Sequence, residues 1–300
     1  MESSPDLPTV LAQWTFHPLW VLVLVAAAAV YWVAYRRAAA RGFPHPRWRL
    51  VSFMLSLVLV LLAVCSPIDH YGRSVLFVDF TGFLLLTMIA PPAMLLGAPL
   101  TLGFRATGKV GSRRLRSLYR CRLVAVVTFP VITWLVFAVA TYVWQFTDLT
   151  ELAVRHQSVR YAEQAMMLGV GLLFWNPAIV ADPLRWRLPY PLRSLYVFVE
   201  MTHKGLFGGM FLSMTTAVHG DLSANAPAWA PAPLTDQRLG ILILWIGGNV
   251  IFLAALIMLI AGWMQYEKRH QERVDRKLRL EAEAKARRRA ALDQVFRKGV

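Results

Sequence analysis

Three ionisable residues lie one helical turn apart in an otherwise apolar stretch. Glu200, His203 and Lys204 are spaced at i, i+3 and i+4, so a helix places them on one face. In a transporter, such a set would relay protons. Alternatively, Glu200 and Lys204 neutralise each other near the cytoplasmic end of a span, because this order suits a helical ion pair, and Lys204 extends towards the inner loops. The sequence favours the neutralised pair, and Gly205 with Gly209 predicts a face for close helix packing.

A second group of residues has the chemistry of a copper site. Histidines gather at the predicted outer ends of the apolar segments, and imidazole and thioether ligands suit Cu(I). The candidate metal ligands are His219, Met214 and Met210, because both methionines precede the histidine on the same predicted span. No two of the outer histidines have HxxxH spacing, so unconnected boundary residues are the alternative interpretation. The outer histidines are His17, His70, His156 and His219.

An acidic residue also lies inside an apolar run. Asp79 follows the start of the run 74–100, where lipid cannot solvate a carboxylate that lacks a partner or a proton. Arg160 begins a later predicted span at a similar depth, and its long side chain can reach that far. We therefore expect an ion pair or a close hydrogen bond between Asp79 and Arg160, with Gln164 adding hydrogen bonds. The alternative is a protonated Asp79, or one bonded to a hydroxyl or backbone group, with Arg160 on a lipid phosphate.

These residues require elements that hold them inside a membrane. The chain of 300 residues is 57% hydrophobic with a mean hydropathy of +0.48, too apolar for an ordinary soluble domain. A span takes about 20 residues at 1.5 Å each. We expect an all-α, polytopic membrane helix bundle of seven transmembrane helices, the third closing on Pro91, Pro92 and the turn 97–99. The expected spans are Leu19–Tyr35, Leu50–Ser66, Val75–Gly97, Leu123–Phe146, Tyr161–Val180, Leu195–Val218 and Leu239–Trp263.

Positive charges lie on the predicted inner side. Lys and Arg outnumber Asp and Glu by 32 to 17. A basic chain can bind nucleic acid, but the cytoplasmic loops of a bacterial inner-membrane protein account for this excess. Residues 1–18 contain no Lys or Arg, so we expect no cleavable signal peptide. The N-terminus is expected outside, followed by a seven-span domain over residues 1–265 and a basic cytoplasmic helical tail over residues 266–300. The tail either binds anionic lipids or is a solvated helix.

Four segments in register resemble the CtaG-type cytochrome oxidase assembly factors. They are SPID at 66–69, LLL through APP at 84–92 with LGAP at 96–99, Glu163 with GLLFWNP at 171–177, and Asp236-Gln237 with Trp245. Their order and spacing match over roughly residues 14–265. The resemblance implies a non-enzymatic membrane protein that helps assemble cytochrome c oxidase and is linked to copper delivery. Its partner would be an oxidase subunit or another membrane assembly factor.

The chain departs from this family where the family carries histidines. The family's third span opens with HMxxH, and Asp79 and Phe83 hold the aligned positions. The histidine pair of the fifth span is replaced by Arg160 and Gln164, while Glu163 is retained. Carboxylate and amide oxygens are poor Cu(I) ligands, so the departure predicts an ion pair in place of a metal bridge. Copper binding is then left to the outer histidine and methionine set.

Other classes of membrane protein stay open. A transporter or channel would need Glu200, His203 and Lys204 to line a wet cavity. A membrane haem protein would need paired axial histidines deep in facing helices, and only His203 lies deep in a predicted span. The sequence shows no nucleophile beside a base, so no catalytic activity is predicted.

Overall fold

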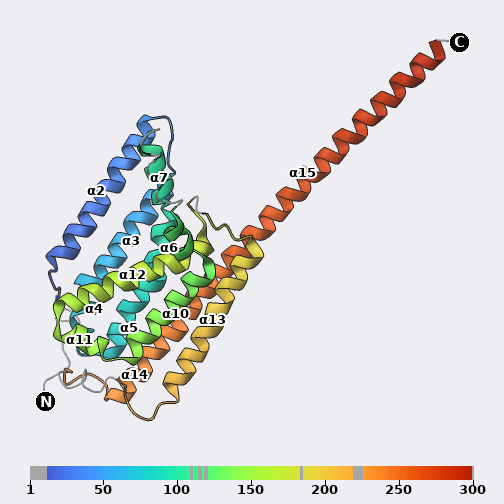
Figure 1. The fold of residues 1–300 in the computed structure, drawn as a ribbon. Coiled ribbons are helices and arrows are strands. Elements are labelled where there is room, and N and C mark those ends of the chain that lie inside the picture. The colour runs from blue at the N-terminus through green and yellow to red at the C-terminus, as the bar shows by residue number, and fades with distance from the viewer. Residues whose placement is uncertain are drawn as a thin grey trace.

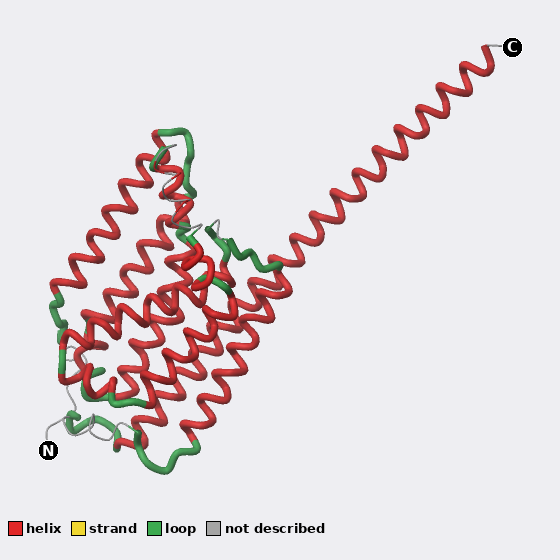
Figure 2. The backbone as a smooth tube through the Cα atoms, in the orientation of Figure 1, coloured by secondary structure: helices red, strands yellow, loops and turns green. Residues whose placement is uncertain are grey.

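The structure is a computed structural model that describes residues 12–108, 111, 113, 117, 121–182, 185–218 and 226–298, with side chains up to residue 287. These residues form helices and no strands (Figure 2), which confirms the all-α prediction. The helices are α2 (Pro18–Ala40), α3 (Arg47–Cys65), α4 (Pro67–Tyr71), α5 (Leu76–Leu84), η1 (Leu85–Ile89), α6 (Ala90–Leu96), α7 (Pro99–Ala106), α9 (Arg122–Val127), α10 (Pro130–Phe146), α11 (Leu149–Arg155), α12 (Gln157–Ile179), α13 (Tyr190–Leu212), α14 (Pro233–Leu242), η3 (Ile243–Gly247) and α15 (Gly248–Lys298).

The helices form a bundle that one helix leaves (Figure 1). Within it, α3 packs against α2 and α6, α12 against α6 and α10, and α13 against α15. The final part of α15 projects alone from the bundle. Because α15 is one uninterrupted helix, the prediction that the basic tail continues the last apolar helix is confirmed.

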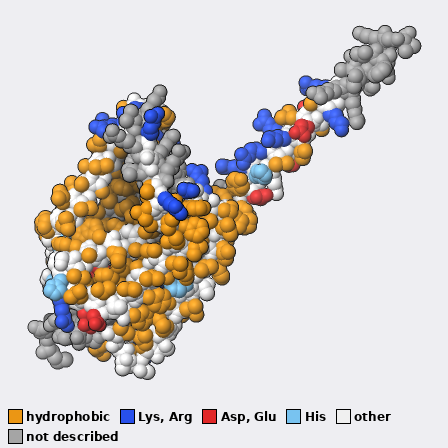
Figure 3. Space-filling view, viewed as in Figure 1, with side chains coloured by type: hydrophobic (Ala, Val, Ile, Leu, Met, Phe, Trp, Pro, Cys, Tyr) orange, Lys and Arg blue, Asp and Glu red, His pale blue; other side chains and the backbone are white. Residues whose placement is uncertain are grey.

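The surface of the bundle is mostly apolar. Figure 3 shows hydrophobic side chains over much of its visible face, whereas charged side chains mark the projecting helix. Four described segments are long and apolar enough to cross a membrane, or five if α10 and α11 together form one span. The four segments are Pro18–Ala40, Arg47–Tyr71, Leu76–Ala106 and Pro233–Arg287. Since α12 and α13 are not among them, the number of seven spans stays a prediction.

The third helical run passes through two prolines. Pro91 and Pro92 lie inside α6, so the expectation that the span closes on them is wrong, although the turn at 97–99 does end the run. A proline lacks the N–H that would bond the carbonyl four residues earlier. That carbonyl, Thr87 O, instead accepts a hydrogen bond of 3.1 Å from Trp175 Nε1 on α12. A neighbouring helix thus replaces the donor that proline removes.

Two π-helical turns interrupt the third and the last helical runs, which approach each other closely. η1 belongs to the third helical run and η3 to the last one. A Cβ atom added to Gly247 would lie 3.1 Å from Leu84 Cδ2, and one added to Gly248 would lie 3.0 Å from Met88 Sδ. The two glycines therefore let the last helical run approach the third one closely beside these turns. Turns of this kind occur often at functional sites.

The predicted span Leu123–Phe146 is broken rather than continuous. α9 ends before a gap of two residues, and α10 begins at Pro130. A proline disfavours helical backbone in the preceding residue, and Phe129 is accordingly extended, with ψ at 130°. Beyond Phe146 the chain bends by 68° into α11.

One glycine brings α13 close to the last helical run. A Cβ atom on Gly208 would lie 2.9 Å from the ring of Trp245. On Gly205 it would lie 3.7 Å from Trp245, and on Gly209 it would meet nothing within 4 Å. The predicted packing face of Gly205 and Gly209 is therefore wrong, and Gly208 makes the contact.

Candidate functional site

Asp69 is fully buried and accepts hydrogen bonds from five side chains. It lies in the short helix α4, which begins where Ser66 Oγ accepts a hydrogen bond of 3.1 Å from Ile68 N. The five donors are Thr15 Oγ1 at 3.5 Å, His17 Nε2 at 3.0 Å, Arg73 Nη2 at 3.2 Å, Arg160 Nε at 3.2 Å and Gln164 Nε2 at 2.7 Å. An ionised carboxylate only accepts hydrogen bonds, so Nε2 of His17 carries the proton.

Arg160 joins this carboxylate to two others. Its Nη1 lies 2.7 Å from Asp79 Oδ1 and 3.0 Å from Glu163 Oε2, while its Nε reaches Asp69. The predicted contact between Asp79 and Arg160 is therefore confirmed. All four side chains are at least 94% buried, so each charge is held mainly by its protein partners instead of by water.

Gln164 links the charged residues to α2. Trp20 Nε1 donates a hydrogen bond of 2.8 Å to Gln164 Oε1, and Gln164 Nε2 donates to Asp69 Oδ1. An indole N–H can only donate, so the amide oxygen must face Trp20. The prediction that Gln164 adds hydrogen bonds is confirmed, with Asp69 rather than Asp79 as the partner. Arg73 Nη2 also donates a hydrogen bond of 2.6 Å to Gln157 Oε1. We call the whole set the Asp69 cluster: Thr15, His17, Trp20, Asp69, Arg73, Asp79, Gln157, Arg160, Tyr161, Glu163 and Gln164.

The Asp69 cluster also reaches the chain segment before α2. Thr15 N donates a backbone hydrogen bond of 3.0 Å to Cys65 O. His17 Nδ1 lies 3.1 Å from Tyr161 Oη, while its other nitrogen donates to Asp69. His17 thereby connects the segment before α2 to Asp69 on α4 and to Tyr161 on α12.

A small cavity of about 20 Å³ adjoins the Asp69 cluster. Such a volume accommodates about one water molecule, which needs roughly 10–15 Å³ and two to four polar partners. The polar lining meets that requirement, and the other wall is apolar. The lining residues are Ala63, Asp79, Gly82, Phe83, Leu86, Arg160, Glu163, Gln164 and Met167.

The Asp69 cluster does not fit a copper ion. Asp79, Glu163 and Gln164 present oxygen atoms beside the cavity, whereas Cu(I) prefers thiolate, thioether and imidazole ligands. Arg160 brings a positive charge to the same place. Across the described residues, no three His, Cys, Asp or Glu side chains are arranged to hold a metal ion.

The second predicted set, on α13, has a different geometry from the one expected. Glu200 is fully buried, and its carboxylate lies 3.3 Å from His203 Nδ1. Lys204 is 2% exposed, and its Nζ has no hydrogen-bond partner in the part of the chain that the structure describes. The preferred interpretation was a Glu200–Lys204 pair that neutralises itself, with Lys204 extending towards the inner loops; the burial of Lys204 shows that this extension is wrong. Lys204 follows the first residue of α13 by 14 positions, which is about 21 Å at helical rise.

The candidate copper ligands are only partly described. His219 lies outside the described residues. Met210 is 39% exposed, and Met214 Sδ lies 4.0 Å from Gln237 Nε2. Copper binding through this set therefore stays a prediction.

Two acidic residues were named in the sequence only as parts of family-like segments, and their structural roles were not predicted. Asp236 accepts hydrogen bonds from the backbone N–H groups of Leu76 and Phe77, at 2.7 and 2.9 Å, and so caps α5. Asp69 was visible only as part of a family-like segment, because no polar periodicity marks it. Its position directly after an apolar helix and a Ser-Pro start signal was the available clue.

The chain is similar to known proteins over most of its length. Residues 29–266 match the model of the cytochrome c oxidase caa3 assembly factor family, Caa3_CtaG. The uncharacterized proteins Mb0105 of Mycobacterium bovis and MT0111 of Mycobacterium tuberculosis are each 27% identical to it over 285 residues. The uncharacterized protein ML1998 of Mycobacterium leprae is 26% identical over the same length.

These alignments cover 92% of this chain but only 43% of each relative, so the chain spans less than half the length of the curated relatives it matches. No solved structure matches it. All four segments that resemble CtaG-type proteins lie within the matched range. The chain belongs to the cytochrome c oxidase caa3 assembly factor family.

Proposed function

We propose that this chain assists cytochrome c oxidase assembly as a membrane scaffold, with a charged network where the family resemblance implies a metal bridge. The observation that carries this proposal is the bond between Arg160 on α12 and Asp79 on α5. Both residues occupy positions where histidines are expected in the family. An arginine bound to three carboxylates can join the two helices without a metal, because its fork of donors satisfies several acceptors at once.

The proposal places the bundle in a bacterial inner membrane with seven spans. Arginines follow the predicted inner ends, as the positive-inside rule requires, and the basic part of α15 would extend into the cytoplasm. There its positive charges would attract anionic lipids. The predicted partner is an oxidase subunit or another assembly factor.

A host strain that lacks the gene tests the role in assembly. We expect the strain to lose the absorption bands of the oxidase and the wild-type gene to restore them. Arg160→Met should fail to restore the bands, whereas Met214→Ala should restore them fully. A strain with normal oxidase content after deletion would contradict the assembly role.

Metal analysis of the purified protein tests the scaffold mechanism separately. We expect that titration with Cu(I) detects no tight site that depends on Asp79 or Gln164. A stoichiometric site lost in Asp79→Ala would contradict the proposed mechanism while leaving the assembly role intact. Any site that depends on Met214 would instead identify the outer set as the copper ligands.

A further inference from the structure

Lys204 carries an amine in the interior of the bundle. Its side chain is 2% exposed, and Nζ has no hydrogen-bond partner among the described residues. Nζ lies 5.6 Å from the ring centre of Phe83 on α5 and 5.4 Å from that of Phe137 on α10. The amine is therefore held between two aromatic faces instead of by a hydrogen-bonding group.

Glu200 is the charged neighbour of Lys204, one turn earlier on the same helix. It is fully buried, and its Oε2 lies 3.3 Å from His203 Nδ1. Around the amine itself, α5 presents Phe83, α10 presents Phe137, and α15 presents Gly248, whose added Cβ would lie 3.9 Å from Lys204 Cδ. Further titratable groups lie near Glu200: His203, which is hydrogen-bonded to it, Tyr142 on α10 and Tyr196 on α13.

An ammonium ion in this position is expensive. Burying a charge without hydrogen bonds is strongly unfavourable, and groups in such sites tend to become neutral instead. The cation–π contacts with the two rings offset only part of that cost. Lys204 can therefore exist as a neutral amine with a free lone pair, and the negative charge of Glu200 favours its protonation.

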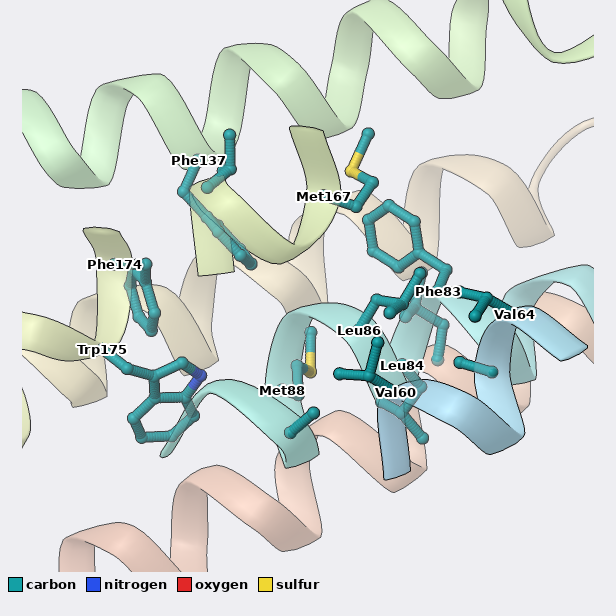
Figure 4. Packing of buried hydrophobic residues seen from close by; sticks show 14 of the residues in the cluster. Val60, Val64, Phe83, Leu84, Leu86, Met88, Phe137, Met167, Phe174 and Trp175 are labelled. Atoms are coloured by element: carbon teal, nitrogen blue, oxygen red, sulfur yellow. The ribbon is translucent and has the colours of Figure 1, made fainter. Parts of the chain in front are cut away.

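Phe83 lies between this amine and the cavity of the Asp69 cluster. The same ring that stacks on Lys204 lines the cavity beside Asp79 and Glu163. Figure 4 shows Phe83 next to Met167, which also lines the cavity, while Phe137 lies near Phe174. Only one of the two aromatic faces around Lys204 thus borders the cavity.

We propose that Lys204 and Glu200 form a proton-binding site inside the bundle, and that the Phe83 ring separates this site from the cavity of the Asp69 cluster. In the loading step, a hydronium ion in the cavity gives up a proton: one O–H bond breaks, and an N–H bond forms on Nζ. Release is the reverse step. Rotation of the Phe83 ring opens the route.

Nuclear magnetic resonance of protein labelled with ¹⁵N at the lysine side chains tests the binding site. The chain contains few lysines, and Lys204→Met identifies the signal of the buried one. The lysines are Lys109, Lys204, Lys268, Lys277, Lys285 and Lys298. We expect Lys204 to show the neutral amine signal at a pH where the other five are ammonium ions. Glu200→Gln should increase its neutral fraction further. Titration of Lys204 together with the other five would overturn the proposal.

A pair of aromatic variants tests the separation. Phe83→Ala and Phe137→Ala each remove one face around Lys204, but only Phe83 lines the cavity. We expect the ammonium fraction of Lys204 to rise in Phe83→Ala, because cavity water then reaches Nζ, and not in Phe137→Ala. Equal changes in both variants would refute a role for Phe83. Phe83→Val, which keeps a branched apolar side chain but is short enough to let cavity water reach Nζ, replaces Phe83→Ala if that variant fails to fold, with the same expected direction.

Discussion

Arg160 Nη1 lies 2.7 Å from Asp79 Oδ1, and this bond joins α12 to α5 in the interior of the bundle. The same guanidinium also holds Glu163 and Asp69. Arg160 is therefore shared among three carboxylates, and Asp79 is one of three acceptors. Loss of Arg160 should consequently lower the stability of the protein more than loss of Asp79.

Arg160→Met should destabilise the protein far more than Asp79→Asn. Loss of the guanidinium leaves three buried carboxylates without a shared partner, and breaking a buried ion pair in this way costs about 3–5 kcal/mol. Asp79→Asn leaves Arg160 with two carboxylates and keeps an acceptor oxygen. Thermal unfolding in detergent measures both effects, with exposed Arg187→Met as the control. An equal fall in unfolding temperature for Arg160→Met and Asp79→Asn would show that Arg160 stabilises the protein through Asp79 alone.

The exchange of the two residues should not rescue either single variant. In Asp79→Arg with Arg160→Asp, the new aspartate would face Asp69 and Glu163, and like charges in a low-dielectric site repel strongly. We expect the double variant to be at least as unstable as Arg160→Asp alone. Recovery of wild-type expression and unfolding temperature by the exchange would contradict the shared role of Arg160.

Asp69→Asn should loosen the segment that leads into α2. The substitution removes the charge that holds His17, Arg73 and Arg160, and an amide NH2 group would oppose at least one of these donors. Hydrogen exchange of the Thr15 amide, which is bonded to Cys65 O, should accelerate while exchange within α13 stays unchanged. An unaltered rate at Thr15 would show that the segment is held without Asp69.

The sequence predicted the contact between Asp79 and Arg160 because both are charged, both lie in apolar runs, and both have similar depth. It could not predict the role of Asp69, since that depends on a one-turn helix pointing a carboxylate inwards. The long apolar helices were likewise predictable from composition, as were most of their boundaries. Their irregularities depend on neighbours, as where Trp175 supplies the donor missing at Pro91.

The pairing of Glu200 with Lys204 illustrates a second limit. Spacing on a helix says that two side chains can meet, but the surrounding helices decide whether they do. Here the rings of Phe83 and Phe137 contact the Lys204 amine, and His203 contacts the Glu200 carboxylate. The contacts from two other helices, α5 and α10, cannot be inferred from spacing within α13.

The pH dependence of stability should contain a contribution from His45. This residue lies between α2 and α3, where burial lowers its pKa below the ordinary 6.5 although Nε2 donates to Gly97 O at 3.0 Å. The unfolded chain therefore binds a proton more readily than the folded one, so stability falls as the pH drops below about 6.5. His45→Gln should flatten that part of the profile of unfolding temperature against pH. A variant with the same slope as the wild type would assign the effect to other groups.

Alanine at two adjacent glycines of α13 should have opposite effects. A Cβ on Gly208 would lie 2.9 Å from the Trp245 ring, so Gly208→Ala forces α13 away from the last helical run and costs about 1–3 kcal/mol, as overpacking does. Gly209 has nothing within 4 Å of an added Cβ, and Gly209→Ala should gain about 0.5–1 kcal/mol because alanine favours a helix. The unfolding temperatures of the two variants in the same detergent test whether the two effects have opposite signs. A loss of stability in Gly209→Ala as large as that in Gly208→Ala would mean that this face of α13 packs against a partner, since no atom of the described part of the chain lies within 4 Å of the added Cβ. Adding Trp245→Leu to Gly208→Ala should restore part of the lost stability, because the smaller side chain makes room for the new methyl group.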